Sequence, residues 1–388
     1  MVTDRQPSAM RVLTFINWLG RGGVETALLR CLPHLRARGV EVDVCCQGAR
    51  RELDADFERC GCRILRIRKC AVPLETAWRL GRELRAGRWD LLHSRMGATS
   101  GGAVLAAARC GLPAVVSVHN GPAATLPAWA ARPGLAAVRR AWLGWHRRLI
   151  DRHARMIVGH SAANLDAFAP GWRSDPARHR VVVNGVEPPG PGPDREECRR
   201  LLGLEPGRLA VLHVGSFKPQ KNHAGLLAAF ARVRESEPGA LLLLAGAGPE
   251  RGERYARRAV RAMGLDGAVR FEGPLAGLRA HYLAADVLLA PSTLEGFGNA
   301  LAEAQAAGLP AVASDIPAHR ESVAPGAQRF LFPLPDYARA AELVLEQARA
   351  ARAGRNPWVA EAGEHVRAHF TVERMAGELA DIYGEVAG

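Results

Sequence analysis

The sequence predicts an α/β protein of two doubly wound, Rossmann-like domains, and three observations support that prediction. The chain of 388 residues is long for one hydrophobic core but comfortable for two domains of roughly 180 residues each. Short apolar runs alternate with helical patterns along its length, as in parallel sheets that are covered by helices. A run of prolines and glycines interrupts this alternation near the middle, so we place the linker near residues 186–193.

The first predicted domain, residues 1–187, begins with a strand, a glycine-rich turn and a helix over residues 10–39. The apolar side chains of that helix fall on one stripe, and Gly39 ends it. This stripe consists of Ala27, Leu28, Cys31, Leu32 and Leu35. Further strands are expected within segments 40–46, 90–94, 114–120 and 155–161.

The second predicted domain, residues 188–369, repeats the plan of strand, polar turn and helix over residues 208–235. Its other strands are expected within segments 240–246, 268–273, 286–292 and 310–315. The last segment, residues 370–388, predicts a capped helix that begins after Thr371. In doubly wound sheets, ligands bind at the carboxyl ends of the strands, so the turns that follow the strands are where we look for function.

Composition excludes several classes of protein. With 48% hydrophobic and 23% charged residues, the chain is neither disordered nor collagen-like. We find neither a signal peptide nor a membrane-spanning run, and therefore expect a cytoplasmic protein. The eight cysteines lack the paired C-x-x-C spacing of a zinc site, so buried reduced thiols are expected, although the clusters at 45–46 and 60–62 leave a metal or redox role open.

The positive charge lies in one half of the chain. Residues 1–187 hold 29 Lys and Arg against 15 Asp and Glu, a net charge of +14, whereas residues 188–388 hold 23 against 24, a net charge of −1. This asymmetry suggests that the first half faces an anionic partner, such as lipid headgroups, a pyrophosphate-bearing acceptor or nucleic acid. An arginine-rich proteome explains why 49 of the 52 basic residues are Arg, but it does not explain the imbalance.

Two turns have the composition of phosphate-binding sites. In "GSFKPQKNH", Lys218 and Lys221 are two of only three lysines in the chain, and they stand just before a helix, where an ammonium group suits a diphosphate. In "LGRGGVET", Gly22 and Gly23 allow backbone amides to approach an anion, although a plain strand-to-helix turn explains this pattern almost as well.

The segment "STLEGFGNALAEAQAAG" places two glutamates in a small, apolar context. If a helix begins near Gly298, Glu295 lies in the preceding turn and Glu303 lies inside the helix. A carboxylate that accepts from two ribose hydroxyls is a common way to hold a nucleoside, and the backbone of Gly296, Phe297, Gly298 and Asn299 offers N–H groups to hydroxyl or phosphate oxygens.

Histidines end two predicted strands of the first domain. His119, followed by Asn120, ends "VVSVHNG", and His93 ends "DLLHS". At the carboxyl end of a strand a histidine is better placed for function than a histidine elsewhere, so we take His119 as a candidate site residue and His93 as a weaker one.

These segments, with "LLLAGAGPE" and the final "HFTVERMAGELADIY", resemble the large family of retaining, nucleotide-sugar-dependent glycosyltransferases called group 1, or family four, which have the GT-B fold. The resemblance spans nearly the whole chain, and the two glutamates within "PSTLEGFGNALAEAQAAGLP" are its most specific part. It implies that the first domain binds the acceptor, that the second binds the donor, and that residues 370–388 pack back onto the first domain.

The resemblance also implies roles for single residues. Glu295 would orient the donor sugar, Glu303 would bind the ribose, and His119 would lie near the sugar's primary hydroxyl. Lys221 matches the lysine that grips the diphosphate. The arginine that usually follows the glycine is replaced here by Ser216, and Lys218 is a possible substitute for it.

The implied chemistry is transfer of a hexosyl or N-acetylhexosaminyl group from a nucleotide-diphosphate sugar with retention, either by front-side attack or through a covalent intermediate. Lys221, Lys218 and the Gly22 and Gly23 amides would stabilise the leaving diphosphate. On the premise that the chain has no Asp-x-Asp metal motif, we predict a metal-independent enzyme without a cofactor.

A basic segment with tryptophans in the first domain suggests attachment to a membrane. Between residues 131 and 155, Leu135, Val138, Trp142, Trp145 and Leu149 recur at helical spacing among arginines. We predict peripheral binding to the inner face of the plasma membrane and a lipid-linked or polysaccharide acceptor, as in lipopolysaccharide synthesis, although a core-facing helix is equally compatible. The candidate membrane residues are Arg139, Arg140, Trp142, Trp145, Arg147 and Arg148.

Rival functions remain. The replacement by Ser216 is compatible with a non-catalytic sugar-nucleotide-binding homologue, and a nucleotide-sugar epimerase can share the fold. A glycoside hydrolase using Glu295 and Glu303 would leave the phosphate-binding turns without a purpose. Nucleic-acid binding lacks an aromatic-interleaved basic motif.

Overall fold

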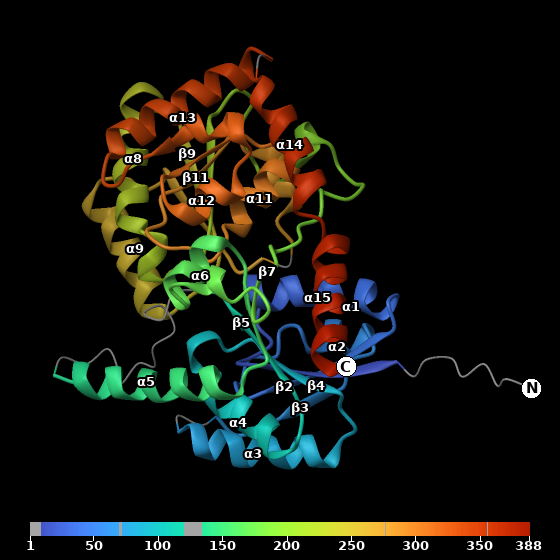
Figure 1. Ribbon diagram of the computed structural model, residues 1–388. Coiled ribbons are helices and arrows are strands. Elements are labelled where there is room, and N and C mark those ends of the chain that lie inside the picture. The colour runs from blue at the N-terminus through green and yellow to red at the C-terminus, as the bar shows by residue number, and fades with distance from the viewer. Residues whose placement is uncertain (1–8, 70–71, 120–133, 276, 355) are drawn as a thin grey trace, which may run out of the picture. The chain divides into compact units, whose positions relative to one another are not determined.

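The computed structural model describes residues 9–69, 72–119, 134–275, 277–354 and 356–388. The chain forms two compact units (Figure 1). The N-terminal unit comprises Met1–Gly185 with Val372–Gly388, and the C-terminal unit comprises Val186–Thr371. The predicted fold class is confirmed, because each unit contains a parallel sheet with helices packed on it.

The sheet of the N-terminal unit has the order β3-β2-β1-β4-β5-β6-β7 among the described residues. Its strands are β1 (Met10–Ile16), β2 (Val40–Cys46), β3 (Ile64–Arg66), β4 (Leu91–Ser94), β5 (Ala114–Val118), β6 (Met156–Gly159) and β7 (His179–Val181). The order reverses between β1 and β4, which is the topological switch point at which doubly wound sheets bind ligands.

Helices form two apolar layers on this sheet. Its helices are α1 (Gly23–Arg36), α2 (Asp54–Arg59), α3 (Pro73–Ala86), α4 (Gly101–Arg109), α5 (Ala136–His153) and α6 (Ala162–Phe168). The predicted stripe of α1 is buried, and it packs against α15 (Val372–Ala387), which returns from the end of the chain (Figure 1). Helices α3 and α4 pack together in a second cluster, and α5 packs on α4.

The sheet of the C-terminal unit has the order β10-β9-β8-β11-β12-β13. Its strands are β8 (Ala210–Val214), β9 (Leu241–Ala245), β10 (Val269–Gly273), β11 (Val287–Ala290), β12 (Ala311–Ser314) and β13 (Leu331–Phe332). Its helices are α7 (Arg195–Leu201), α8 (His223–Ser236), α9 (Glu250–Ala262), α10 (Arg279–Ala284), α11 (Asn299–Ala306), α12 (Pro317–Ser322), α13 (Tyr337–Arg352) and α14 (Pro357–His369). The strand order reverses between β8 and β11, so the turns after these two strands meet at the switch point.

Candidate active site

The switch point of the C-terminal unit joins the two turns that the sequence singles out. The turn after β8 carries Lys218 and Lys221, and the turn after β11 carries Glu295. The two turns are bonded together, because the Thr293 amide donates to the carbonyl oxygen of Gln220 at 2.8 Å. Residues 74 positions apart in sequence therefore form one site.

An ion pair between Lys221 and Glu295 is the centre of this site. The Lys221 Nζ donates to Glu295 Oε1 at 2.5 Å, and the two side chains are 20% and 13% exposed. Burial works to raise the pKa of Glu295, but the Lys221 ammonium, His319 and the Ser292 hydroxyl outweigh it and hold that pKa below its usual value. Glu295 is therefore an ionised acceptor at neutral pH.

Two residues that the sequence analysis did not select support the ion pair. His319 of α12 is buried beside Glu295, and its Nδ1 lies 2.8 Å from the carbonyl oxygen of Ser314. Asn222 adopts a left-handed conformation with φ 51° and caps α8 by accepting from the Gly225 amide at 3.1 Å. Its Nδ2 also donates to the carbonyl oxygen of Pro291 at 3.0 Å, which fixes the end of β11 to the start of α8. Because the left-handed region favours Asn and Gly, an Asn directly before a predicted helix could have identified Asn222 from the sequence.

The predicted position of the two glutamates relative to a helix is confirmed. Helix α11 begins at Asn299, so Glu295 lies in the turn before it and Glu303 lies inside it. The Tyr282 hydroxyl of α10 donates to Glu303 Oε2 at 2.8 Å, and Tyr282 is itself buried. The carboxylate of Glu303 is therefore held in place by a residue that the sequence analysis missed.

The turn before α11 requires glycine. Gly298 has φ 105°, and a Cβ there would lie 2.9 Å from Ser322 Oγ. The Phe297 ring is buried edge-to-face against Phe370 with centroids 5.0 Å apart, so only its backbone is available to a ligand. The amides of Phe297 and Gly298 have no acceptor within the described residues, in agreement with a loop that offers N–H groups.

Lys218, the possible substitute for the expected arginine, is partly exposed. Lys218 caps the short 3₁₀ turn Pro219–Lys221, and its amide donates to the Ser216 carbonyl oxygen at 2.6 Å. Its ammonium forms no ion pair with the part of the chain that the structure describes. Lys218 therefore carries a cation that a ligand can pair.

The glycine-rich turn of the N-terminal unit differs from the open anion cradle that its sequence suggests. The Gly22 amide donates to the Gly20 carbonyl oxygen at 2.9 Å. The Glu25 carboxylate folds over the same turn, and a Cβ on residue 22 would lie 2.4 Å from Glu25 Oε2. The Gly22 amide is thus already occupied, whereas that of Gly23 has no acceptor among the described residues.

His119 lies at the carboxyl end of β5, as predicted, while Asn120 falls outside the described residues. The His119 ring stacks on His160, which follows β6, with centroids 4.4 Å apart. Burial, His160 and Arg95 lower the pKa of His119 well below its usual value, so its ring is neutral at pH 7. His93 is fully buried and bonded at both nitrogens, to Tyr383 and Ser117, which gives it a structural role.

The predicted amphipathic helix exists as α5, but its buried face differs from the predicted stripe. His146 and Ile150 are its buried residues, while Trp142 and Trp145 are half-buried and Val138 is 53% exposed. His146 is buried although it lies beside the predicted stripe, because α4 packs there and the Gly101 amide donates to His146 Nδ1.

The arginines of α5 differ in their environments. Arg147 lies over the Phe168 ring and pairs with Asp151, so it is part of the packing. Arg140 and Arg148 are exposed, and Arg139 is half-buried.

The premise about metal motifs was wrong, because Asp54-Ala55-Asp56 has the Asp-x-Asp spacing. Both carboxylates lie on α2 and are paired with arginines, Asp54 with Arg66 and Asp56 with Arg59. Within the described ranges, no group of three or more His, Cys, Asp or Glu side chains is arranged to hold a metal ion. Among the helices described, none has both the length and the apolar character that crossing a bilayer requires.

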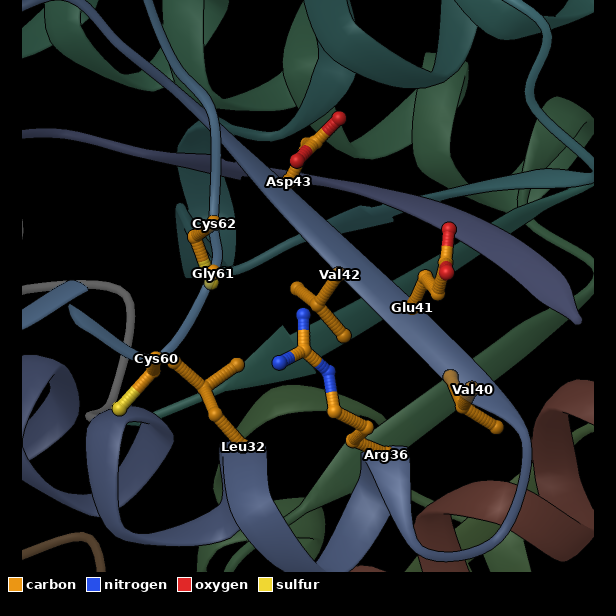
Figure 2. Close-up of a pocket in the computed structure, with 9 residues that line it drawn as sticks. All are labelled: Leu32, Arg36, Val40, Glu41, Val42, Asp43, Cys60, Gly61 and Cys62. Carbon is orange, nitrogen blue, oxygen red and sulfur yellow. The ribbon is translucent and has the colours of Figure 1, made fainter. Parts of the chain in front are cut away.

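A small pocket lies in the N-terminal unit and shares no residue with the candidate site (Figure 2). It is lined by the first half of β2, by α1 and by the turn before β3, so it lies at the amino ends of the strands and not at the ligand-binding edge. Burial, Asp43 and Cys60 raise the pKa of Cys62 to about 12, which keeps this thiol protonated and unreactive. The lining residues are Leu32, Arg36, Val40, Glu41, Val42, Asp43, Cys60, Gly61 and Cys62.

Fold and site define a glycosyltransferase of the GT-B type, and the comparisons identify the family. Residues 21–188 match the model described as Glycosyltransferase Family 4, and residues 208–348 match Glycosyl transferases group 1. The chain belongs to the group 1, family 4 glycosyltransferases.

Similar curated proteins include two named D-inositol 3-phosphate glycosyltransferase. That of Actinosynnema mirum is 30% identical over 76% of each chain, and that of Thermomonospora curvata is 30% identical over 79% of this chain and 77% of its own length. Similar solved structures include Anabaena HepE in complex with UDP and glucose, with 19% identity, TM-score 0.80 and coverage of 97% of this chain and 99% of that one. Another is the sucrose-phosphate synthase of Thermosynechococcus elongatus, with 21% identity, TM-score 0.73 and coverage of 97% and 98%.

Proposed function

We propose that this glycosyltransferase uses a nucleotide-diphosphate sugar as donor and retains the anomeric configuration. The observation that carries the proposal is the Lys221–Glu295 pair beside the Tyr282-bound Glu303, at the switch point of the C-terminal unit. A UDP complex and a UDP-glucose complex are known for a protein of similar fold, which favours UDP among the nucleotides to test.

In this proposal each residue of the site binds a different part of the donor. Glu303, held by Tyr282, accepts from the ribose hydroxyls. Lys221 has three N–H donors and gives one to Glu295, so the others can meet the departing diphosphate together with Lys218. Glu295, kept ionised by Lys221, orients the sugar hydroxyls, and the amides of Phe297 and Gly298 complete the cradle. No step of this scheme needs a metal ion.

Calorimetry with UDP-, GDP- and ADP-sugars, with and without Mg²⁺, tests the donor site. One nucleotide sugar should bind wild type without metal, and Lys221→Ala and Glu303→Ala should each weaken binding by about 10-fold or more, as expected for charged hydrogen bonds. The controls are Lys69→Ala, because Lys69 is the remaining lysine and lies exposed in the other unit, and Glu346→Ala on α13.

Binding of no nucleotide sugar, or equal binding by Lys221→Ala, contradicts the donor proposal. Binding without turnover in any acceptor screen favours the non-catalytic homologue. An epimerised nucleotide sugar favours the epimerase. For an active enzyme, NMR of the product's anomeric carbon decides retention, and an inverted product contradicts it.

We also propose that the N-terminal unit binds the anionic inner leaflet of the plasma membrane and receives a lipid-linked or polysaccharide acceptor there. Its four exposed large apolar side chains in the described ranges are Val72, Leu74, Trp78 and Val138, on or beside α3 and the start of α5. Both helices pack on α4: Gly102 faces Pro73, and Gly101 faces His146. The same two helices carry Arg82, Arg139 and Arg140. Exposed apolar side chains together with basic ones suit a membrane interface.

Sedimentation with phosphatidylglycerol vesicles tests this surface. The variant Arg139→Ala/Arg140→Ala should bind about 5-fold more weakly per arginine, because each basic residue near an anionic surface contributes about 1 kcal/mol. Arg251→Ala/Arg258→Ala on α9 is the matched control. Equal vesicle binding by both double variants, or none by wild type, rules the surface out.

A further inference from the structure

The N-terminal unit contains a buried cation that has no counter-charge among the described residues. Arg95 directly follows β4 and is 4% exposed. Its Nε and both Nη atoms are buried, and their polar contact in the described part of the chain is with the Tyr383 hydroxyl, which carries no charge. A buried guanidinium without a counter-charge is strongly unfavourable, so we looked for a ligand that would supply the missing charge.

The polar groups around Arg95 also lack partners. His119 and His160 stack on each other, and the Nε2 atom of each is buried without a hydrogen bond to any described residue. His93 and Tyr383 complete the surroundings and are bonded to each other at 2.6 Å. The Tyr383 hydroxyl also interacts with Arg95, but it supplies no negative charge, since burial raises the pKa of Tyr383 to about 12. Among the described residues, therefore, no carboxylate neutralises Arg95, and two imidazole nitrogens beside it have no partner.

The topology places these groups at a ligand-binding edge. Arg95, His119 and His160 follow β4, β5 and β6, three adjacent parallel strands, so all three lie at their carboxyl ends. The Arg95 amide donates to the Phe15 carbonyl oxygen of β1 at 2.8 Å, which fixes Arg95 at the switch point between β1 and β4. Doubly wound sheets bind ligands at this point.

We propose that Arg95, together with His119 and His160, forms an oxyanion site that holds a phosphate or carboxylate group of the acceptor. The guanidinium fork matches two oxygens of such a group, and the imidazoles contribute further hydrogen bonds. The assignment to the acceptor rests on the proposed function, in which the donor diphosphate already has Lys218 and Lys221 in the other unit. It gives His119 a role at the acceptor, in place of the role near the donor sugar that the family resemblance implies.

Thermal shift and calorimetry with inorganic phosphate at constant ionic strength test the site without turnover. Wild type should be stabilised by phosphate, and Arg95→Met should lose the response, with affinity reduced about 10- to 100-fold as expected for charge-assisted hydrogen bonds. Arg95→Lys keeps the charge but not the fork and should fall between them. Arg109→Met, at an exposed position of the same unit, is the control.

A second measurement separates this site from a structural role. Without phosphate, Arg95→Met should melt at or above the wild-type temperature, because it removes an unpaired buried charge. A large loss of stability in that variant, or a phosphate response that it retains, overturns the proposal. So does a wild type that responds to neither phosphate nor acetate.

Nucleotide-sugar binding by Arg95→Met separates the two proposals. Donor affinity equal to that of wild type, with the phosphate response lost, supports the oxyanion site. Absence of donor binding in wild type contradicts the proposed function while leaving the phosphate response readable. Glycerol 1-phosphate and phosphatidic acid vesicles then distinguish a soluble phosphate ligand from a lipid headgroup. If the ligand is a lipid headgroup, binding to the vesicles depends on Arg95; if it is a soluble phosphate, only glycerol 1-phosphate binding does.

Discussion

At the scale of single residues, the candidate site depends on pairs that hold functional groups in place. Lys221 keeps Glu295 ionised although the carboxylate is buried, and Tyr282 fixes the orientation of Glu303. Because a free glutamate side chain has several rotamers, a bonded one loses less freedom when it accepts from a ligand.

We predict that Tyr282→Phe weakens nucleotide-sugar binding by roughly 3- to 10-fold, which corresponds to one lost hydrogen bond, and changes turnover at saturating donor little. Calorimetry and steady-state kinetics measure the two effects. Tyr255→Phe, at a 60% exposed position on α9, should match wild type. A drop in turnover with unchanged affinity would contradict a role in donor binding.

At the scale of elements, the last helix completes the first core. Helix α15 packs on α1 and buries seven side chains, among them Leu379 and Tyr383, which are both fully inaccessible. The N-terminal unit is therefore assembled from two segments that are distant in sequence, and residues 372–388 contribute to its core.

We predict that Leu379→Ala lowers the free energy of unfolding by about 2–5 kcal/mol, as for other buried leucines replaced by alanine. Urea denaturation followed by circular dichroism measures it. Asp381→Ala, on the exposed face of the same helix, should change the free energy by no more than about 0.5 kcal/mol. Similar effects in the two variants would show that α15 does not pack as described.

At the scale of the whole molecule, buried histidines make stability depend on pH. Burial is the main cause that lowers the pKa of His160 and His213 to about 3 and of His146 and His223 to about 4. Both units contain such residues. Since these side chains take up protons in the unfolded chain near pH 6.5 but not in the folded one, acid favours unfolding.

We predict that the free energy of unfolding falls as the pH is lowered from about 6.5 toward 4, by up to about 1.4 kcal/mol per pH unit for each buried histidine. Urea denaturation at pH 7.5, 6.5 and 5.5 measures this slope. His160→Gln should flatten it, whereas exposed His369→Gln should not. An equal slope in all three proteins would contradict the low pKa of His160.

Whether a strand could be predicted from the sequence depends on how many residues its pattern spans. Strands of four or more residues, such as β2 and β8, were predicted within their segments because alternation with helices marks them. The strands β3, β7 and β13 have only two or three residues and were not predicted, since so short a run carries no periodicity. In α5 the stripe was displaced, because the approach of α4 and not the apolar pattern decides which side chains are buried.

The sequence by itself determined the fold class, the position of Glu295 and Glu303 around the start of α11, and the membership of the glycosyltransferase family. These features follow from the spacing of residues along short segments of the chain, and this spacing is kept when the segments form strands, turns and helices. Only the tertiary structure decided which side chains are paired: Glu295 with Lys221, Glu303 with Tyr282, and Arg95 with no carboxylate among the residues that the structure describes. The physical reason is that the strand order of a parallel sheet brings together the ends of strands that are distant in sequence, so partners and missing partners are set by topology.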